Sequence, residues 1–235
     1  MMTKFKYLFK KIPGVNFVWD YISLNRLKKQ DIESRFTNIF FKNGWGDENS
    51  LSGTGSNLVE TEIVRQALEK LIKDLKIKTI LDIPCGDFFW MKLVDLGEVQ
   101  YVGADIVKPL IELNKTNYEG ANRKFCQLDL IKDNLPTADL VICRDCLVHL
   151  SFEDIFKSIK NIKRSGSVYL LTTTFNKHTE NGDIVTGRWR PLNLEMAPFN
   201  FPKPTLSVNE GCHEGDQFSD KTLALWRLSD LPISI

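Results

Sequence analysis

The chain of 235 residues is long enough for one full α/β domain with a short extension, and too short for two typical domains. With 43% hydrophobic and 26% charged residues, the composition is globular and excludes intrinsic disorder over most of the chain. The 31 basic and 30 acidic residues leave a net charge of +1, which argues against a nucleic-acid-binding protein.

Residues 1–42 form the first predicted unit, a basic amphipathic extension of two short helical stretches separated at Pro13-Gly14. Residues 1–30 hold seven basic residues and one acidic residue (+6), whereas the remainder holds 24 basic and 29 acidic residues (−5). We expect residues 1–30 either to contact an anionic membrane surface or a partner enzyme, or to pack on the domain as a lid. No apolar run approaches the roughly 18 residues of a membrane span, and we expect no signal peptide.

Residues 43–235 form the second predicted unit, a single α/β domain. A loop rich in Gly, Ser and Asn at 43–57 precedes a helix at 58–75. Short apolar runs then predict strands at 79–83, 100–104, 124–127, 140–143 and 168–173, separated by helices at 88–96, 108–118 and 152–162. After a Pro-rich loop, residues 206–209 and 222–228 resemble two closing strands. This order predicts a doubly wound, mostly parallel seven-stranded sheet with an antiparallel closing strand.

Acidic residues lie at or just beyond the ends of three of these strands. Asp82 belongs to LDIPCGD, in which Gly86 permits close approach of a ligand to the backbone and a following helix would present amides to an anion. Asp105 lies about twenty residues downstream, where a carboxylate accepts hydrogen bonds from ribose hydroxyls. Asp129, in QLDL, is placed to bind an adenine amine beside apolar residues. The alternative for each acid is a helix cap or a solvated loop carboxylate.

The ordered segments LDIPCG, GADI, QLDL and DLVICRD resemble the cofactor framework of class I S-adenosylmethionine-dependent methyltransferases. GTGSNLVETEIVR, ICRDCLVHLSFEDI, LLTTTF and RWRPLNL are similar to segments of small bacterial methyltransferases associated with surface-polysaccharide genes. The resemblance implies a Rossmann-like fold, S-adenosyl-L-methionine as the methyl donor and S-adenosyl-L-homocysteine as its product. The odd number of five cysteines, without regular spacing, favours free thiols in a reducing cytoplasm.

The resemblance also implies which residues bind the cofactor. Asp82, Gly86 and Asp87 lie near the methionine moiety, Asp105 and Ile106 near the ribose, and Asp129 and Leu130 near the adenine. Two further groups complete the predicted cofactor site: Cys143 and Arg144 after the fourth strand, and Gly53, Gly55, Ser56 and Thr61 on the N-terminal side.

His149 and Asp145 are the catalytic candidates, in the segment that leaves the fourth strand. Histidine suits removal of a hydroxyl proton near neutral pH, and a helical turn would let Asp145 orient His149. Asp145 as the base is an alternative; so is a structural role, with His149 capping or packing and Asp145 pairing with Arg144.

The predicted substrate wall consists of Arg188, Trp189, Arg190 and Asn193, because arginines pair with phosphate or carboxylate and tryptophan stacks on sugars. The alternative is an exposed mobile loop. No metal is expected, since the histidines match no compact ligand motif. The predicted reaction is O-methylation of a sugar or other small polar acceptor in capsule or lipopolysaccharide synthesis. The alternatives are transfer to an amine or a phosphate-type oxygen, and a non-catalytic cofactor-binding partner subunit.

Overall fold

The computed structural model describes residues 24–25 and 27–232. Its strands are β1 (Thr79–Asp82), β2 (Gln100–Asp105), β3 (Arg123–Gln127), β4 (Leu140–Cys143), β5 (Tyr169–Phe175), β6 (Leu206–Asn209) and β7 (Lys221–Arg227). Its α-helices are α3 (Ile32–Phe41), α4 (Glu62–Asp74), α5 (Lys108–Tyr118) and α6 (Phe152–Arg164).

The strands form one seven-stranded sheet in the order β3-β2-β1-β4-β5-β7-β6. Strands β1 to β5 pair in parallel, and β7 runs antiparallel to both β5 and β6. The predicted doubly wound sheet with an antiparallel closing strand is therefore confirmed. The strand order reverses between β1 and β4, and ligands bind at such a switch point in open α/β sheets.

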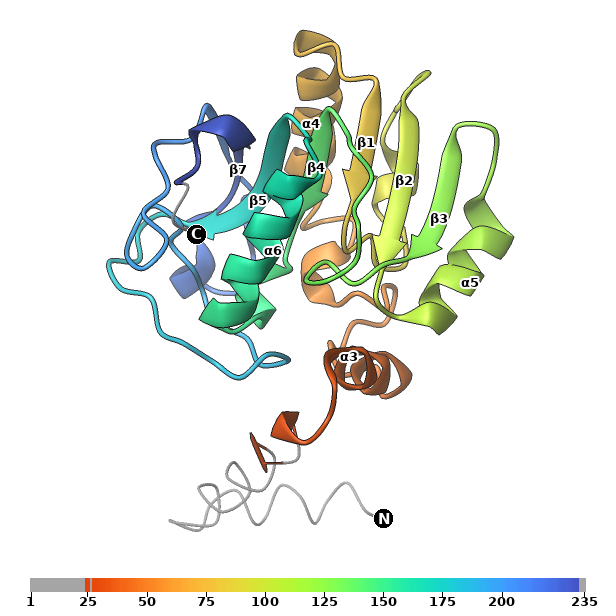
Figure 1. The fold of residues 1–235 in the computed structure, drawn as a ribbon. Coiled ribbons are helices and arrows are strands. Elements are labelled where there is room, and N and C mark those ends of the chain that lie inside the picture. The colour runs from red at the N-terminus through yellow and green to blue at the C-terminus, as the bar shows by residue number, and fades with distance from the viewer. Residues whose placement is uncertain (1–23, 26, 233–235) are drawn as a thin grey trace.

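Helices cover both faces of the sheet because the central strands are apolar on both faces. Helix α6 covers one face of the sheet (Figure 1). On that face, Leu81 and Val141 belong to the same core cluster as Ile155 and Ile159 of α6. On the other face, Ile80, Leu140 and Ile142 pack with residues of α4 and α5 in a second cluster: Val64, Leu68, Leu71, Ile72 and Ile111. This packing fixes the carboxyl ends of β1, β2 and β4 at one edge of the sheet.

The helix predicted at 88–96 is wrong. The connection from β1 to β2 consists of turns and a three-residue 3₁₀ helix, Met91–Leu93. Phe88 has a left-handed φ of 57°, and Phe88, Trp90 and Met91 are buried in the core, so the segment is held by tertiary packing rather than helical periodicity. The anion-binding helix N-terminus expected after Gly86 is therefore missing.

Helix α3 lies beyond the sheet edge at which β1 and β2 end (Figure 1). Its Arg35 guanidinium donates to the Thr186 carbonyl at 3.0 Å, and Glu33 accepts from Gln127 at 2.9 Å. Residues 32–41 thus pack on the domain, although the sequence placed them in the extension. The basic residues 1–23 of that extension lie outside the described residues.

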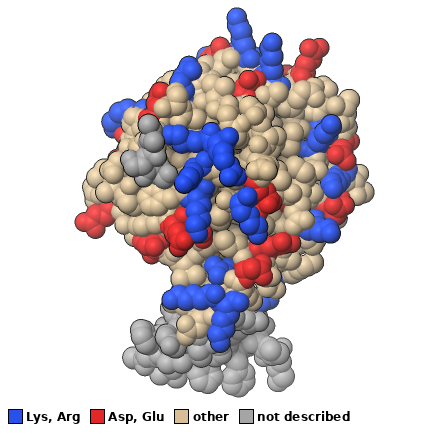
Figure 2. Space-filling view, in the orientation of Figure 1, with Lys and Arg blue, Asp and Glu red and all other residues tan. Residues whose placement is uncertain are grey.

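The described part of the chain contains no helix long and apolar enough to cross a membrane. On the face shown in Figure 2, basic and acidic side chains are interspersed on a mostly uncharged surface. That mixture is unlike the continuous basic stripe of a nucleic-acid-binding face.

Candidate active site

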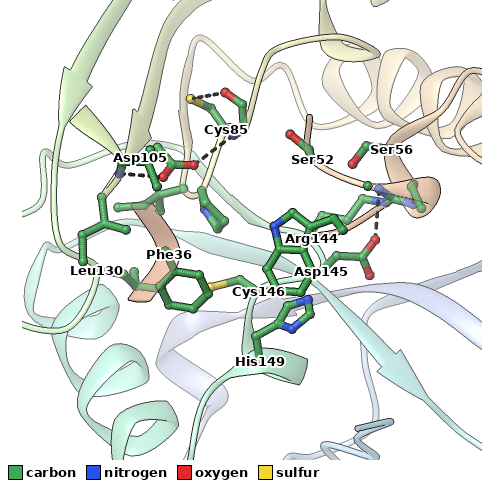
Figure 3. Close-up of a pocket in the computed structure, with 18 of the residues that line it drawn as sticks. Phe36, Ser52, Ser56, Cys85, Asp105, Leu130, Arg144, Asp145, Cys146 and His149 are labelled. Carbon is green, nitrogen blue, oxygen red and sulfur yellow. Dashed lines mark hydrogen bonds and ion pairs between the residues drawn. The ribbon is translucent and has the colours of Figure 1, made fainter. Parts of the chain in front are cut away.

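A cavity of about 470 Å³ opens at the carboxyl ends of β1, β2 and β4. Its walls come from these strand ends, from α3, from the loop at 51–56 and from the C-terminal third of the chain. Figure 3 shows Asp105, Leu130 and Phe36 toward one end, and Arg144, Asp145 and His149 toward the other. The cavity thus has a largely apolar end that includes Asp105 and a charged end that includes His149.

Asp105 lies at the end of β2 and is fixed by backbone groups. Its carboxylate accepts hydrogen bonds from the amides of Val107 at 2.9 Å and Gly86 at 3.2 Å. Asn114 of α5 holds the Gly86 carbonyl at 2.7 Å, so the turn after β1 is fixed from both sides. Burial raises the pKa of Asp105 to about 6 against the effect of these amides. The carboxylate is therefore preorganised to accept further hydrogen bonds from a ligand.

Asp82 ends β1 at the floor of the cavity and is 3% exposed. The Tyr101 hydroxyl donates to its carboxylate at 2.6 Å. Burial raises the pKa of Asp82 to about 7, although the Tyr101 hydrogen bond opposes the shift. A cation bound in the cavity would favour the ionised form and would be attracted by it.

The apolar end is closed by two elements far apart in sequence. Leu128, Leu130 and Ile131 follow β3, and opposite them α3 contributes the side chains Ile32, Phe36 and Phe40. The Asp129 carboxylate, between the leucines, accepts the Ile131 amide at 2.8 Å and lies 3.1 Å from the Lys132 ammonium. A flat apolar group with a polar edge fits between these walls.

Arg144, directly after β4, is the centre of a buried ionic cluster. Its guanidinium contacts Glu210 at 2.6 Å and Asp145 at 3.2 Å, and it donates to the Gly55 carbonyl at 2.8 Å. Lys221 approaches Asp145 at 2.7 Å and Glu210 at 3.4 Å. Burial raises the pKa of Asp145, but Arg144 and Lys221 outweigh it and hold that pKa low. Asp145 is therefore a stable anion and a poor proton acceptor.

His149 is oriented by a backbone carbonyl and an aromatic ring. Its Nδ1 lies 3.0 Å from the Arg188 carbonyl oxygen, and its ring centroid lies 4.3 Å from that of Trp45. A carbonyl only accepts, so this contact places the proton on Nδ1 and leaves the Nε2 lone pair available. Burial lowers the pKa of His149 to about 4, so the imidazole is neutral at physiological pH.

The predicted pairing of Asp145 with His149 on one helical turn is replaced by other contacts. Asp145 has a left-handed φ of 52°, and the following residues form a 3₁₀ helix, Leu147–His149. Asp145 pairs with Arg144 and Lys221, and the Arg188 carbonyl orients His149. The alternative pairing of Asp145 with Arg144 is the one observed.

Most of the residues predicted to bind the cofactor line the cavity, whereas three of them do not line it and contact neighbouring segments instead. The lining residues are Gly53, Gly55, Ser56, Asp82, Gly86, Asp105, Ile106, Asp129, Leu130 and Arg144. Asp87 instead holds the neighbouring loop, because its carboxylate accepts from the Leu51 amide at 2.7 Å and from the Ser52 hydroxyl at 2.9 Å. Thr61 is fully buried before α4 and donates to the Asn57 carbonyl at 2.7 Å. Cys143 is fully buried in β4, and its carbonyl accepts from Thr172.

Of the predicted substrate wall, only Trp189 lines the cavity. Arg190 is a structural residue: its guanidinium donates to the carbonyls of Leu147 at 2.9 Å and Leu150 at 2.7 Å. Asn193 donates to the His178 carbonyl at 2.7 Å and is likewise buried. Arg188 does not line the cavity and contributes its carbonyl to His149.

Sequence reasoning missed the α3 wall, Trp45, and the cluster partners Glu210 and Lys221. The signal for the α3 wall was present, since Ile32, Phe36 and Phe40 recur at the i, i+4, i+8 spacing of one helical face. Glu210 and Lys221 carry no such signal, because the pairing of β6 with β7 brings them to the ionic cluster around Arg144. Among the described residues, no group of three or more His, Cys, Asp or Glu side chains is arranged to hold a metal ion.

No protein-family model matches the sequence, and none of the curated proteins compared with it does. The structure, however, is similar to solved methyltransferase structures at low sequence identity. The methyltransferase domain of the bacterial protein CtHen1 matches with a TM-score of 0.55 and 14% identity, over 73% of this chain and 98% of that domain.

Two further structures are similar to a comparable extent. Magnesium protoporphyrin IX methyltransferase (ChlM) from Synechocystis PCC 6803, solved with bound S-adenosylmethionine, gives a TM-score of 0.55 and 13% identity over 83% of this chain and 96% of that one. The N-methyltransferase NodS from Bradyrhizobium japonicum WM9 gives a TM-score of 0.53 and 13% identity over 74% and 98%. The protein therefore has the Rossmann-like fold of class I S-adenosylmethionine-dependent methyltransferases.

Proposed function

We propose that the protein is an S-adenosylmethionine-dependent methyltransferase that methylates a hydroxyl group of a small carbohydrate, with His149 as the general base. The observation that carries this proposal is the position of His149, which lines one end of the cavity with its Nδ1 held against the Arg188 carbonyl. At the other end, Asp105 and the α3 wall form a cradle suited to an adenosine.

The residues present fit the cofactor. Asp105 would hold the ribose hydroxyls, Asp129 and the apolar walls would hold the adenine, and the buried Asp82 would favour the positive charge. Five of the charged side chains that line the cavity are acidic (Asp82, Asp105, Asp129, Asp145 and Glu214) and two are basic (Arg144 and Lys221), which favours a cationic ligand. When bound, S-adenosylmethionine supplies an activated methyl group: the acceptor oxygen bonds to its carbon while the sulfur–carbon bond breaks and leaves its electron pair on sulfur.

The chain's own residues supply alignment and proton removal. His149 Nε2 accepts the proton that the acceptor hydroxyl loses, and the Arg188 carbonyl stabilises the resulting imidazolium through Nδ1. The anionic Asp145 adds electrostatic stabilisation of that imidazolium without exchanging protons itself. The low pKa of Asp145 supports His149, rather than Asp145, as the base.

The proposed acceptor is a sugar of a surface glycan. The supporting observations are the Trp189 ring in the cavity wall and the sequence resemblance to methyltransferases associated with surface-polysaccharide genes. The proposed site of action is the cytoplasm.

Isothermal calorimetry and a methyl-transfer assay test the function together. We expect S-adenosylhomocysteine to bind the wild type and His149→Gln with similar Kd, and Asp105→Ala to bind it at least about tenfold more weakly. His149→Gln should lower kcat about 10² to 10⁴-fold.

Absence of S-adenosylmethionine binding would refute the proposal. Full turnover by His149→Gln would favour an amine or phosphate-type oxygen acceptor over a hydroxyl. Binding without transfer to any acceptor pool would favour a non-catalytic partner subunit.

A further inference from the structure

The cavity end beyond His149 is lined by aromatic rings from three distant segments. Trp45 follows α3, Trp189 lies in the long loop after β5, and Phe218 lies just before β7. Trp189 and Phe218 are held edge to face at a centroid distance of 5.0 Å, and Phe175 buttresses Trp189 at 6.0 Å. Trp189 remains 42% exposed despite these contacts. The end of the cavity therefore presents a rigid aromatic surface with room for a ligand.

Charged side chains line the same end, and its two cations are already neutralised. Lys221 and Arg144 each contact both Asp145 and Glu210. Glu214 adds a further carboxylate, whose only hydrogen-bond donors among the described residues are the Thr54 hydroxyl and the Cys212 thiol. The local charge is thus negative, and a phosphate placed here would meet repulsion, because both cations that line this end among the described residues are already paired with carboxylates.

Arg190, one of the two arginines that the sequence analysis offered as partners of a phosphate, binds backbone groups instead. Arg190 is 8% exposed, and its guanidinium donates to three backbone carbonyls, those of Leu147, Leu150 and Gly182. Turning this guanidinium toward a ligand would leave those buried carbonyls without their donors. The loop after β5 therefore contributes the Trp189 ring to the cavity wall, whereas its buried Arg190 stabilises the backbone around it.

From this arrangement we propose that the acceptor subsite consists of Trp45, Trp189 and Phe218 with Glu214, and that it binds an uncharged glycosyl ring. The negative charge at this end of the cavity excludes sugar phosphates and nucleotide-activated sugars as acceptors in this proposal. A pyranose has an apolar C–H face that stacks on Trp189 and hydroxyls that donate to carboxylates such as Glu214. This inference rests on the proposed methyltransferase function and specifies its substrate class.

The test uses a small-molecule extract of the source organism, divided on an anion exchanger into an unretained and a retained fraction. Each fraction is incubated with the full-length protein and S-adenosylmethionine carrying a labelled methyl group. We expect label to enter a carbohydrate in the unretained fraction, with or without prior phosphatase treatment of that fraction.

Transfer only to the retained fraction, abolished by phosphatase, would overturn the acceptor class while leaving the methyltransferase function in place. A labelled product without a sugar ring would also overturn the acceptor class and leave the methyltransferase function in place. No transfer to either fraction would overturn the acceptor inference together with the function.

Binding provides a readout apart from turnover. With the S-adenosylhomocysteine-loaded protein, saturation-transfer NMR on the unretained fraction should give signals from sugar ring protons. Trp189→Ala should abolish these signals and raise the apparent KM for that fraction about tenfold, with the Kd for S-adenosylhomocysteine unchanged. Phe41→Ala is the matched control, since Phe41 is 69% exposed and does not line the cavity. Equal behaviour of the two variants would refute the aromatic subsite.

Discussion

Replacement of Asp82 by asparagine should make the ligand-free protein more stable at alkaline pH. Asp82 is almost fully buried at the end of β1, and its pKa is raised from 3.8 to about 7. Asparagine has the same shape and still offers a carbonyl oxygen to the Tyr101 hydroxyl, which donates at 2.6 Å. The substitution therefore removes the ability to ionise while keeping the volume and that hydrogen bond.

The size of the effect follows from the two pKa values of Asp82. The folded-state pKa lies above the unfolded value, so folding is opposed by ionisation, and stability falls as pH rises from about 4 through about 7. Each unit between the two values is worth about 1.4 kcal/mol, so the full penalty is ~4 kcal/mol, of which ~2–3 kcal/mol develops between pH 5 and 8. Asp82→Asn lacks this dependence and should exceed the wild type by ~2 kcal/mol or more at pH 8.

Urea unfolding followed by tryptophan fluorescence at pH 5, 6, 7 and 8 measures this difference. Asp139→Asn is a control of opposite sign. Burial raises the pKa of the Asp139 carboxyl, but hydrogen bonds from the amides of Lys78 and Thr79 outweigh burial and hold that pKa low. The ionised Asp139 carboxylate stabilises the fold above its unfolded-state pKa, and this stabilisation is lost in acid. Asp139→Asn should therefore be less stable than the wild type at pH 8. An Asp82→Asn variant that is destabilised equally at every pH would refute the reasoning. The same variant should bind S-adenosylmethionine more weakly, because it lacks the charge that favours a cation.

Three further substitutions probe two residues that line the cavity and one that supports it. Gly86→Ala should lower the free energy of unfolding by ~1–2 kcal/mol, because Gly86 has a φ of 53° and an added Cβ would lie 2.2 Å from Ser52 Oγ. Thermal denaturation should show a lower Tm, and calorimetry should show weaker cofactor binding. Phe36→Ala should weaken S-adenosylhomocysteine binding several-fold in calorimetry with little change in Tm, since no residue of α3 is fully buried; unchanged binding would remove α3 from the site. Arg190→Met should lose ~2–3 kcal/mol in urea unfolding because buried carbonyls lose their donor, and unchanged stability would argue against a structural role.

The acids that follow the strands were predictable from sequence. Asp82 and Asp105 end apolar runs and Asp129 lies two residues beyond the predicted strand 124–127, and parallel strands necessarily end at one edge of a sheet. Their convergence on one cavity therefore follows from local pattern and fold class alone. The position of His149 was predictable for the same reason, because it lies in the short segment that follows β4 at that edge.

The C-terminal substrate wall was not predictable in the same way. Arg188, Trp189 and Arg190 are adjacent, and residue type alone favoured the arginines as ligands of an anion. The path of the loop decides otherwise: it turns Trp189 to the cavity and brings Arg190 against the carbonyls that follow β4. The direction of a side chain in an irregular loop depends on contacts with residues some forty positions away.

The sequence by itself determined the doubly wound sheet and the edge at which its acidic residues meet, because both follow from short-range alternation of apolar and polar residues. Only the tertiary structure decided that α3 closes the apolar end of the cavity. It also decided that Asp145 is bound by Arg144 and Lys221, and that a carbonyl of the loop after β5 orients His149. The contacts of Asp145 and His149 join residues that no periodic pattern relates, and they depend on how the strand pairing and the loops bring distant segments together.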